Sequence, residues 1–355
     1  MNIFLDDLFD LNYFSDPNIY LNKWTHKVFE HLDEYIDNSL IINVTTLQEK
    51  TLQSLELNQY RYIFILDLVD PPHYNTHLRI LSNLFSDHLD KTYYVSCAHK
   101  NPYFKTIYFN IFLALGPEKI VELDTNRQFI KKYVSFNRNP HYHRLLLLKT
   151  LYENNLLEEG YVSGYLYANN KSVFSLKNYP KSFIKDLDSD FLNLFPIVCK
   201  EDSLEINSEI YNDDIENDFY NIPKPYYLSP VSLLAETSTH NDSLFLTEKS
   251  LKSLVCKQLI MPIGSPRTYQ FLTKTYGLKN YGFDFEPRIA DHSFDYKIKY
   301  YCGFLKETTL DDLTAIYKQK EDILEYNKNK VLKEFKQISY NLFLTSLKKH
   351  HIIHS

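Results

Sequence analysis

The hydrophobic pattern alternates between short apolar runs and segments with helical spacing. Residues 60–70 form a continuous apolar run that stops at Asp70, which is typical of a parallel strand buried on both faces. Shorter runs at residues 93–97 and 133–136 also predict strands, and residues 77–84 have the spacing of a helix. The alternation predicts an α/β fold built on parallel sheets.

The most informative stretch is residues 232–266, which predicts a strand, a polar loop, a helix and a second strand. The first apolar run ends at Glu236, and the second ends at Gly264. Between them Thr247 precedes a helical segment, and threonine is a favoured N-cap residue. In an open α/β sheet this order places a loop at the carboxyl ends of the strands, where ligands bind.

Helices are predicted on both sides of this stretch. Asn139 as N-cap and Pro140 at the first helical position predict a helix that runs to about residue 155. Residues 308–348 have helical spacing throughout, and residues 1–60 are expected to be mostly helical.

The length of 355 residues favours two domains, because a single domain of this size is uncommon. Gly116-Pro117 is a firm break in the pattern, after which the strand–helix alternation restarts. We expect an N-terminal domain at 1–125, a second domain at 126–305 with an irregular acidic insertion at 160–228, and a helical tail at 306–355.

Composition narrows the classes of function. The formal charge is −6, which argues against a nucleic-acid groove because phosphate binding needs a basic surface. The start of the chain turns acidic at once, and no apolar run approaches the roughly 20 residues of a membrane span. We expect a soluble, cytoplasmic protein. Four cysteines lack metal-ligand spacing, which favours thiols in a reducing compartment: Cys97, Cys199, Cys256 and Cys302.

Lys249 is unusual for its position in the first turn of a predicted helix. The helix dipole disfavours a cation there, whereas an anion is favoured. A lysine at this place is explained if it binds an anion together with the helix N-terminus. The sequence therefore predicts an anion site, and a nucleoside diphosphate is the expected anion.

Four segments together resemble the donor signature of the inverting α1,3-fucosyltransferase-like glycosyltransferases, including relatives in phages and large viruses. The resemblance covers roughly residues 130–300. Asp70-Pro-Pro-His73 is a looser match to the acceptor-domain segment of that family. The four segments are Asn139-Pro…Arg144, Glu236-Thr-Ser, Phe245-Leu-Thr-Glu-Lys249 and Ile263-Gly-Ser265.

The resemblance implies a GT-B architecture, with two facing Rossmann-like domains, the donor nucleotide in the C-terminal half and the acceptor in the cleft. It implies a nucleotide-diphosphate sugar as co-substrate, with GDP as one candidate nucleotide, and no metal or other cofactor, since no Asp-x-Asp motif accompanies the signature. The donor-site residues that it implies are Arg144, Glu236, Phe245, Thr247, Glu248, Lys249, Gly264 and Ser265.

The resemblance also implies roles. Lys249 would neutralise the donor diphosphate and Arg144 would clamp it, since a guanidinium pairs with phosphate in a bidentate way. Glu248 would accept from the ribose hydroxyls. The alternatives are a solvated lysine, an arginine at a helix end, and a first-turn glutamate that favours the helix dipole.

Two further positions have open interpretations. Glu236 either lines the donor site or holds the next helix as a structural cap, and Thr247 is first of all an N-cap. Phe245 stands where the family has tyrosine, so one possible hydrogen bond to the donor is missing and the donor sugar stays open.

Asp70 is the predicted catalytic base, because it ends a strand and a double proline fixes the following turn. Asp67 and His73 are the substitutes. The alternative is an aspartate that simply favours the turn before proline.

The leading hypothesis is an inverting, metal-independent glycosyltransferase that transfers a sugar to a hydroxyl of a saccharide acceptor. One alternative is a phage-type enzyme that acts on hydroxymethylated DNA bases, against which the acidic charge counts. Another is a non-catalytic module that binds a saccharide or nucleotide.

Overall fold

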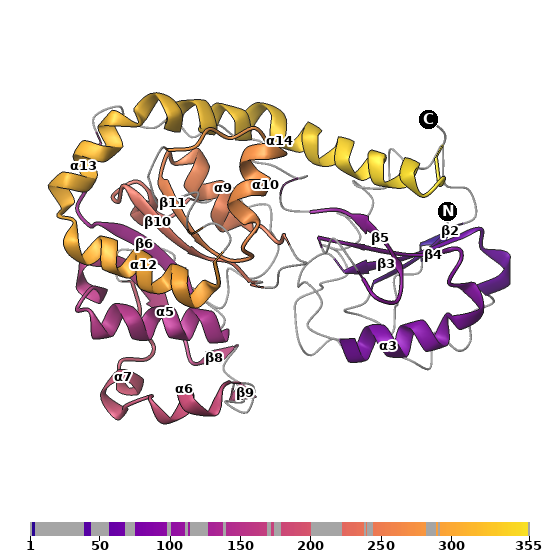
Figure 1. The fold of residues 1–355 in the computed structure, drawn as a ribbon, viewed down its shortest axis with the longest axis horizontal. Coiled ribbons are helices and arrows are strands. Elements are labelled where there is room, and N and C mark those ends of the chain that lie inside the picture. Colours follow the sequence, from indigo (N-terminus) through magenta and orange to yellow (C-terminus); the bar gives the residue numbers. More distant parts are fainter. Residues whose placement is uncertain are drawn as a thin grey trace.

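The structure is a computed structural model with two parallel sheets and a helical C-terminal region (Figure 1). The predicted α/β class is confirmed. The described residues are 2–3, 39–43, 57–67, 75–97, 101–110, 113, 127–137, 140–168, 172–173, 179–199, 222–237, 239, 244–281, 289 and 292–353.

The first sheet has five parallel strands in sequential order, so each strand lies beside the next one along the chain. Its strands are β1 (Asn2–Ile3), β2 (Ser39–Asn43), β3 (Tyr62–Asp67), β4 (Thr92–Ser96) and β5 (Lys105–Tyr108). Residues 63–66 of β3 are all buried, as the continuous apolar run predicts. The helix α3 (Asn75–Leu84) follows β3 and confirms the predicted helix.

The expectation that residues 1–60 are mostly helical is wrong for β1 and β2. The apolar part of β2 is the short run Leu40-Ile-Ile42. A run of this length is compatible with a strand or with a buried helix, so periodicity does not distinguish them. Parallel pairing with β3 decides the outcome in favour of a strand.

The second sheet has four parallel strands in the order β11-β10-β6-β7. Their bounds are β6 (Tyr133–Asn137), β7 (Gly160–Gly164), β10 (Val231–Ala235) and β11 (Leu259–Ile263). Every residue of β10 and β11 is buried. The strands predicted around the most informative stretch are therefore confirmed.

The strand β7 lies in the segment that we expected to be an irregular insertion, and the expectation is wrong at this point. Two glycines lower the strand propensity of this segment. Their function is packing, because a Cβ atom on Gly160 would come within 2.4 Å of the Tyr133 ring, and one on Gly164 within 2.5 Å of Leu148 Cδ1. The short helices expected in this segment are present as α6 (Lys181–Lys185) and α7 (Ser189–Asn193).

Helices cover the second sheet. The helix α5 (Tyr142–Glu153) packs beside α12 (Phe294–Glu307), and α9 (Glu248–Val255) packs beside α14 (Glu321–Lys349). The half of the molecule that contains the second sheet also includes α10 (Thr268–Lys274) and α13 (Leu310–Gln319).

The start of α5 differs from the prediction by two residues. His141 is the N-cap, and its side chain makes no capping hydrogen bond. The predicted first helical residue, Pro140, instead accepts a hydrogen bond from the buried Tyr179 hydroxyl at its carbonyl. This tertiary contact lies just before the observed helix start, and local N-cap preference does not reveal it.

The long helix α14 connects the two halves of the molecule (Figure 1). Near its start Asn327 accepts from the Lys279 backbone N–H at 2.8 Å, and near its end the Phe343 ring lies 5.1 Å from that of Phe109. Beyond the helix, His350 Nε2 lies 3.1 Å from the carbonyl oxygen of Thr106 in β5. The predicted helical tail is confirmed, and α14 packs on β5 of the first sheet and on α9 beside the second sheet.

Replacing Phe335 by alanine is expected to lower the free energy of unfolding by about 3–5 kcal/mol. Phe335 is fully buried on α14, with its ring 4.4 Å from that of Tyr276, so the truncation leaves a cavity. Urea denaturation measures the change. The control is Lys333→Ala, an exposed position on the same helix, which should stay within about 0.5 kcal/mol of the unchanged protein. An equal, small change in both variants would contradict this account of how α14 packs.

Among the described residues, no helix is long and apolar enough to cross a membrane. All four cysteines are buried free thiols.

Candidate functional site

The second sheet has a topological switch point between β6 and β10. The chain passes from β6 through α5 to β7 on one side, and from β10 through α9 to β11 on the other. Because such crossovers are right-handed, α5 and α9 cover opposite faces of the sheet. In open α/β sheets ligands bind in the crevice at the carboxyl ends of the strands at such a switch point. The residues that follow β6 and β10 are therefore the candidate site.

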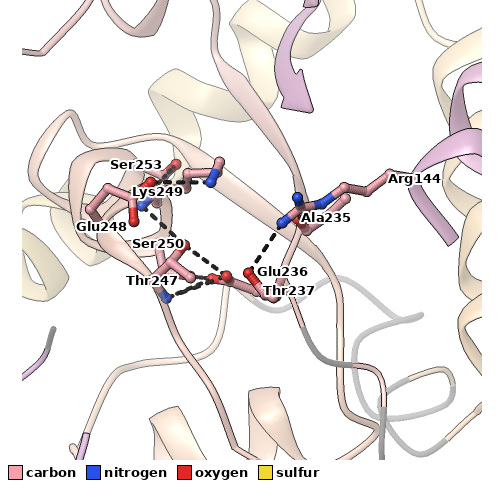
Figure 2. Close-up of polar contacts among 9 residues, drawn as sticks. All are labelled: Arg144, Ala235, Glu236, Thr237, Thr247, Glu248, Lys249, Ser250 and Ser253. Carbon is pink, nitrogen blue, oxygen red and sulfur yellow. Dashed lines mark hydrogen bonds and ion pairs between the residues drawn. The ribbon is translucent and has the colours of Figure 1, made fainter. Parts of the chain in front are cut away.

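Glu236 directly follows β10 and is the buried centre of this site, with 1% of its surface exposed. One carboxylate oxygen accepts from the Thr247 hydroxyl at 2.8 Å, and both accept from the Thr247 backbone N–H at 3.3 Å. The Ser250 hydroxyl donates to the other oxygen (Figure 2). The carboxylate thus ties the end of β10 to the beginning of α9.

The pKa of the Glu236 carboxyl is raised by burial, although hydrogen bonds from Ser250 and Thr247 and the charge of Lys249 lower it in part. Burial disfavours the charged form, and donors directed at a carboxylate favour it. Of the two open interpretations, these contacts support the one in which Glu236 holds the following helix.

Arg144 brings a guanidinium to the switch point from the opposite helix. It lies in the first turn of α5 and is 2% exposed. Its Nε donates to the Ala235 carbonyl at 3.1 Å, and its Nη2 donates to Thr237 Oγ1 at 3.3 Å. The neighbouring His143 has Nε2 at 2.6 Å from the Glu236 carbonyl oxygen. The beginning of α5 is therefore bonded to the end of β10, and Figure 2 shows Arg144 and the α9 residues around the same strand end.

Glu248 and Lys249 occupy the first turn of α9. Thr247 is the N-cap, and its hydroxyl accepts from the Lys249 backbone N–H at 3.4 Å, as predicted. Lys249 Nζ lies 3.1 Å from Glu248 Oε1, and both side chains are partly exposed. Burial raises the pKa of Glu248, but the charges of Lys249 and Lys252 outweigh it, so this pKa is lowered. Glu248 is therefore a carboxylate acceptor at neutral pH.

The loop before α9 contacts the first sheet. The Leu244 backbone N–H donates to the carbonyl of Cys97, which follows β4, at 3.2 Å. Asn110, which follows β5, donates from Nδ2 to the carbonyls of Leu244 and Leu246 at 3.4 and 3.3 Å. Phe245 lies between them and is buried. The carboxyl ends of strands in both sheets thus meet at the loop that precedes Glu248 and Lys249.

The other predicted donor residues follow β11. Gly264 is buried, and Ser265 is 2% exposed. The Ser265 Oγ has no hydrogen-bond partner among the residues that the structure describes.

Asp70 and its substitute His73 lie outside the described residues. The other substitute, Asp67, is the last residue of β3 and pairs with Ser96 of β4. It therefore lies at the carboxyl end of the first sheet, where Cys97 follows β4. The catalytic base therefore stays a prediction.

The sequence reasoning missed Lys297 and the side chain of Asn137. Lys297 is the fourth residue of α12 and is 1% exposed, with Nζ 3.5 Å from the Ser265 carbonyl oxygen. A lysine in the first turn of a helix was the signal that marked Lys249, and the same signal marks Lys297. Asn137 ends β6, and its Oδ1 is buried with no hydrogen-bond partner in the described part of the chain.

Nothing in the described ranges groups three or more histidine, cysteine, aspartate or glutamate side chains as a metal site would. The Asp188-Ser-Asp190 segment resembles a metal motif in sequence, but the Asp188 carboxylate caps α7 by accepting from the Phe191 backbone N–H at 2.6 Å.

No family model matches the chain, and no curated protein matches it. Among solved structures, the chain is similar to a crystal structure of alpha1,3-fucosyltransferase, with 13% sequence identity and a TM-score of 0.37. The match covers 91% of this chain and 93% of that one. What the candidate site can bind follows from its own geometry.

Proposed function

We propose that the protein is a glycosyltransferase that moves a sugar from a nucleotide-diphosphate donor to a hydroxyl of a saccharide acceptor, with inversion at the anomeric carbon. The observation that carries the proposal is the switch point itself. Arg144 and Lys249 lie in the first turns of α5 and α9, which cover opposite faces of the sheet at this point, and the buried Glu236 fixes both helix beginnings to β10.

The donor diphosphate fits this arrangement because it offers several negative charges at one place. The N-terminus of α9 presents backbone N–H groups and a positive dipole end. Arg144 supplies a planar fork of donors and Lys249 a point charge, which are complementary ways to bind phosphate. Glu248, an acceptor-only carboxylate beside Lys249, would accept from the ribose hydroxyls.

The reaction would be a single in-line displacement. The acceptor oxygen forms a bond to the anomeric carbon while the bond from that carbon to the phosphate oxygen breaks. The acceptor proton passes to a base, for which Asp70 is the candidate and Asp67 and His73 are the substitutes. The leaving diphosphate gains charge in the transition state, and Lys249 and Arg144 would stabilise that charge without a metal ion.

A thermal-shift panel of GDP, UDP, ADP, TDP and CMP tests the donor site. A nucleotide at 100 times its dissociation constant should stabilise the protein by about 2.7 kcal/mol, and we expect one diphosphate to do so. If none of the five raises the melting temperature, the proposed donor site is wrong.

The matching nucleotide sugars then test transfer. The expected products are free nucleoside diphosphate and a glycoside whose anomeric configuration is opposite to that of the donor, as read by proton NMR. Retention of configuration would contradict the single displacement. Tight binding of the nucleotide sugar without release of nucleoside diphosphate, with every saccharide acceptor tried, would indicate a binding module.

A further inference from the structure

We propose that Ser265 and Lys297 form a second half of the anion site, which binds the phosphoryl oxygens of the donor diphosphate from the α12 side. This inference rests on the proposed function, and it deepens that function by adding Lys297 to the predicted donor residues and by assigning a phosphoryl contact to Ser265.

The strand that leads to Ser265 is the neighbour of the strand whose end Arg144 contacts. Ala235 of β10 pairs with Ile263 of β11, and the Glu236 backbone N–H continues this ladder by donating to the Ile263 carbonyl at 3.0 Å. Thr237 and Ser265 each lie two residues beyond these paired strand ends, and neighbouring strands lie about 4.8 Å apart. Both residues therefore lie just beyond the carboxyl ends of adjacent strands.

Each of these two residues holds a basic side chain. Thr237 Oγ1 accepts from Arg144 Nη2 at 3.3 Å, and the carbonyl oxygen of Ser265 lies 3.5 Å from Lys297 Nζ. The buried side chains of Arg144 and Lys297 thus contact residues that follow adjacent strands at the carboxyl edge of the sheet. An anion bound at this edge would be attracted by both positive charges.

The helices that carry these cations converge at their N-termini. The Phe294 ring, at the start of α12, lies 5.9 Å from the His143 ring and 5.7 Å from the Tyr142 ring, both at the start of α5. Both helices therefore direct the positive ends of their dipoles to the same edge of the sheet, which adds to the attraction for an anion.

A separate observation indicates a ligand at this place. The Ser265 hydroxyl is buried, and it has no hydrogen-bond partner among the described residues. Buried polar groups in native proteins nearly always have a partner. A phosphoryl oxygen beside Lys297 would accept from this hydroxyl, so the ligand would complete a hydrogen bond that the protein leaves open.

The chemical class follows from the charge. Lys249 lies on the α9 side of the sheet and Lys297 on the α12 side, with Arg144 near the end of β10. A monophosphate is expected to contact fewer of these three cations than a diphosphate, which has two phosphoryl groups. We therefore expect Lys297 to contribute more to the binding of a nucleoside diphosphate than to that of the corresponding monophosphate.

Isothermal titration calorimetry with the diphosphate selected by the panel, and with its monophosphate, tests the inference on the full chain. Lys297→Met should weaken diphosphate binding about 10- to 100-fold, as expected for loss of a charged hydrogen-bond partner, and monophosphate binding by less than about 3-fold. Lys297→Arg retains the charge and should recover most of the affinity. The control Lys299→Met removes an exposed charge two residues away on α12 and should bind as the unchanged protein does.

A second variant keeps the test valid if Lys297→Met fails to fold. Ser265→Ala removes only the hydroxyl and should weaken diphosphate binding about 3- to 10-fold, the value of one neutral hydrogen bond.

Unchanged diphosphate affinity in Ser265→Ala and in folded Lys297→Met would overturn the inference, as would equal losses for diphosphate and monophosphate. If the unchanged protein binds no nucleotide, the proposed function fails. If it binds, and Lys249→Met weakens binding while the Lys297 and Ser265 variants do not, only this inference fails.

Discussion

Replacing Lys249 by methionine is expected to lower kcat for sugar transfer by about 10²- to 10³-fold, the usual effect of removing one preorganised group that stabilises transition-state charge. The Lys249 side chain is partly exposed, and among the described residues it forms an ion pair with the neighbouring Glu248. Its main effect should therefore be on the leaving diphosphate. Release of nucleoside diphosphate from the donor selected by the panel measures the change.

Stability separates this effect from misfolding. A partly exposed ion pair between adjacent residues contributes at most about 1 kcal/mol, so the melting temperature of Lys249→Met should change little. Lys274→Met removes an exposed lysine from the end of α10 and serves as the matched control, with unchanged turnover. Full activity of Lys249→Met under saturating donor would remove Lys249 from the catalytic site.

The elements that local patterns specify were predicted well. The buried strands β3 and β10 have continuous apolar runs, and Thr247 has the sequence context of an N-cap. These features depend on neighbours in the chain, so the sequence alone contains the information. The start of α5 lies two residues later than predicted, next to a contact between Tyr179 and Pro140, 39 residues apart, which a local pattern does not contain.

The candidate site likewise contains residues that a local pattern reveals and residues that only tertiary packing brings together. Lys249 was found because a cation in the first turn of a helix is a local electrostatic anomaly. Lys297 shares that anomaly, but its place beside Ser265 depends on strand register and on the packing of α12, which the sequence pattern does not reveal. The predicted role of Phe245 in the donor site stays a prediction, and so does the open identity of the donor sugar that its missing tyrosine hydroxyl implies.

The role of Glu236 is where the structure adds most to the sequence. The sequence left open whether this residue lines the donor site or holds the following helix. In the structure its carboxylate accepts hydrogen bonds from three groups at the start of α9, namely the Thr247 backbone N–H and the hydroxyls of Thr247 and Ser250. Lys249 is therefore positioned by Glu236 through α9, and the proposed donor site depends on a side chain that is itself buried.

Replacing Glu236 by alanine is accordingly expected to lower the free energy of unfolding by about 2–4 kcal/mol, because buried donors at Thr247 and Ser250 lose their acceptor. Diphosphate binding should weaken as well, since the beginning of α9 is no longer fixed to β10. Urea denaturation gives the stability change. Glu153→Ala breaks an exposed i,i+4 pair with Lys149 and should cost at most about 1 kcal/mol.

The pH dependence of this stability loss gives a sharper test. Burial raises the pKa of Glu236 above its usual 4.5 in the folded protein, so the folded state holds this proton more tightly than the unfolded chain does. The stabilising contribution of the group is therefore greatest below the unfolded-state pKa, and it falls as pH rises through the folded-state pKa. The difference in unfolding free energy between the unchanged protein and Glu236→Ala should thus be larger near pH 4 than at pH 7. A difference that grows with pH would show that the hydrogen bonds from α9 outweigh burial and hold this carboxylate charged.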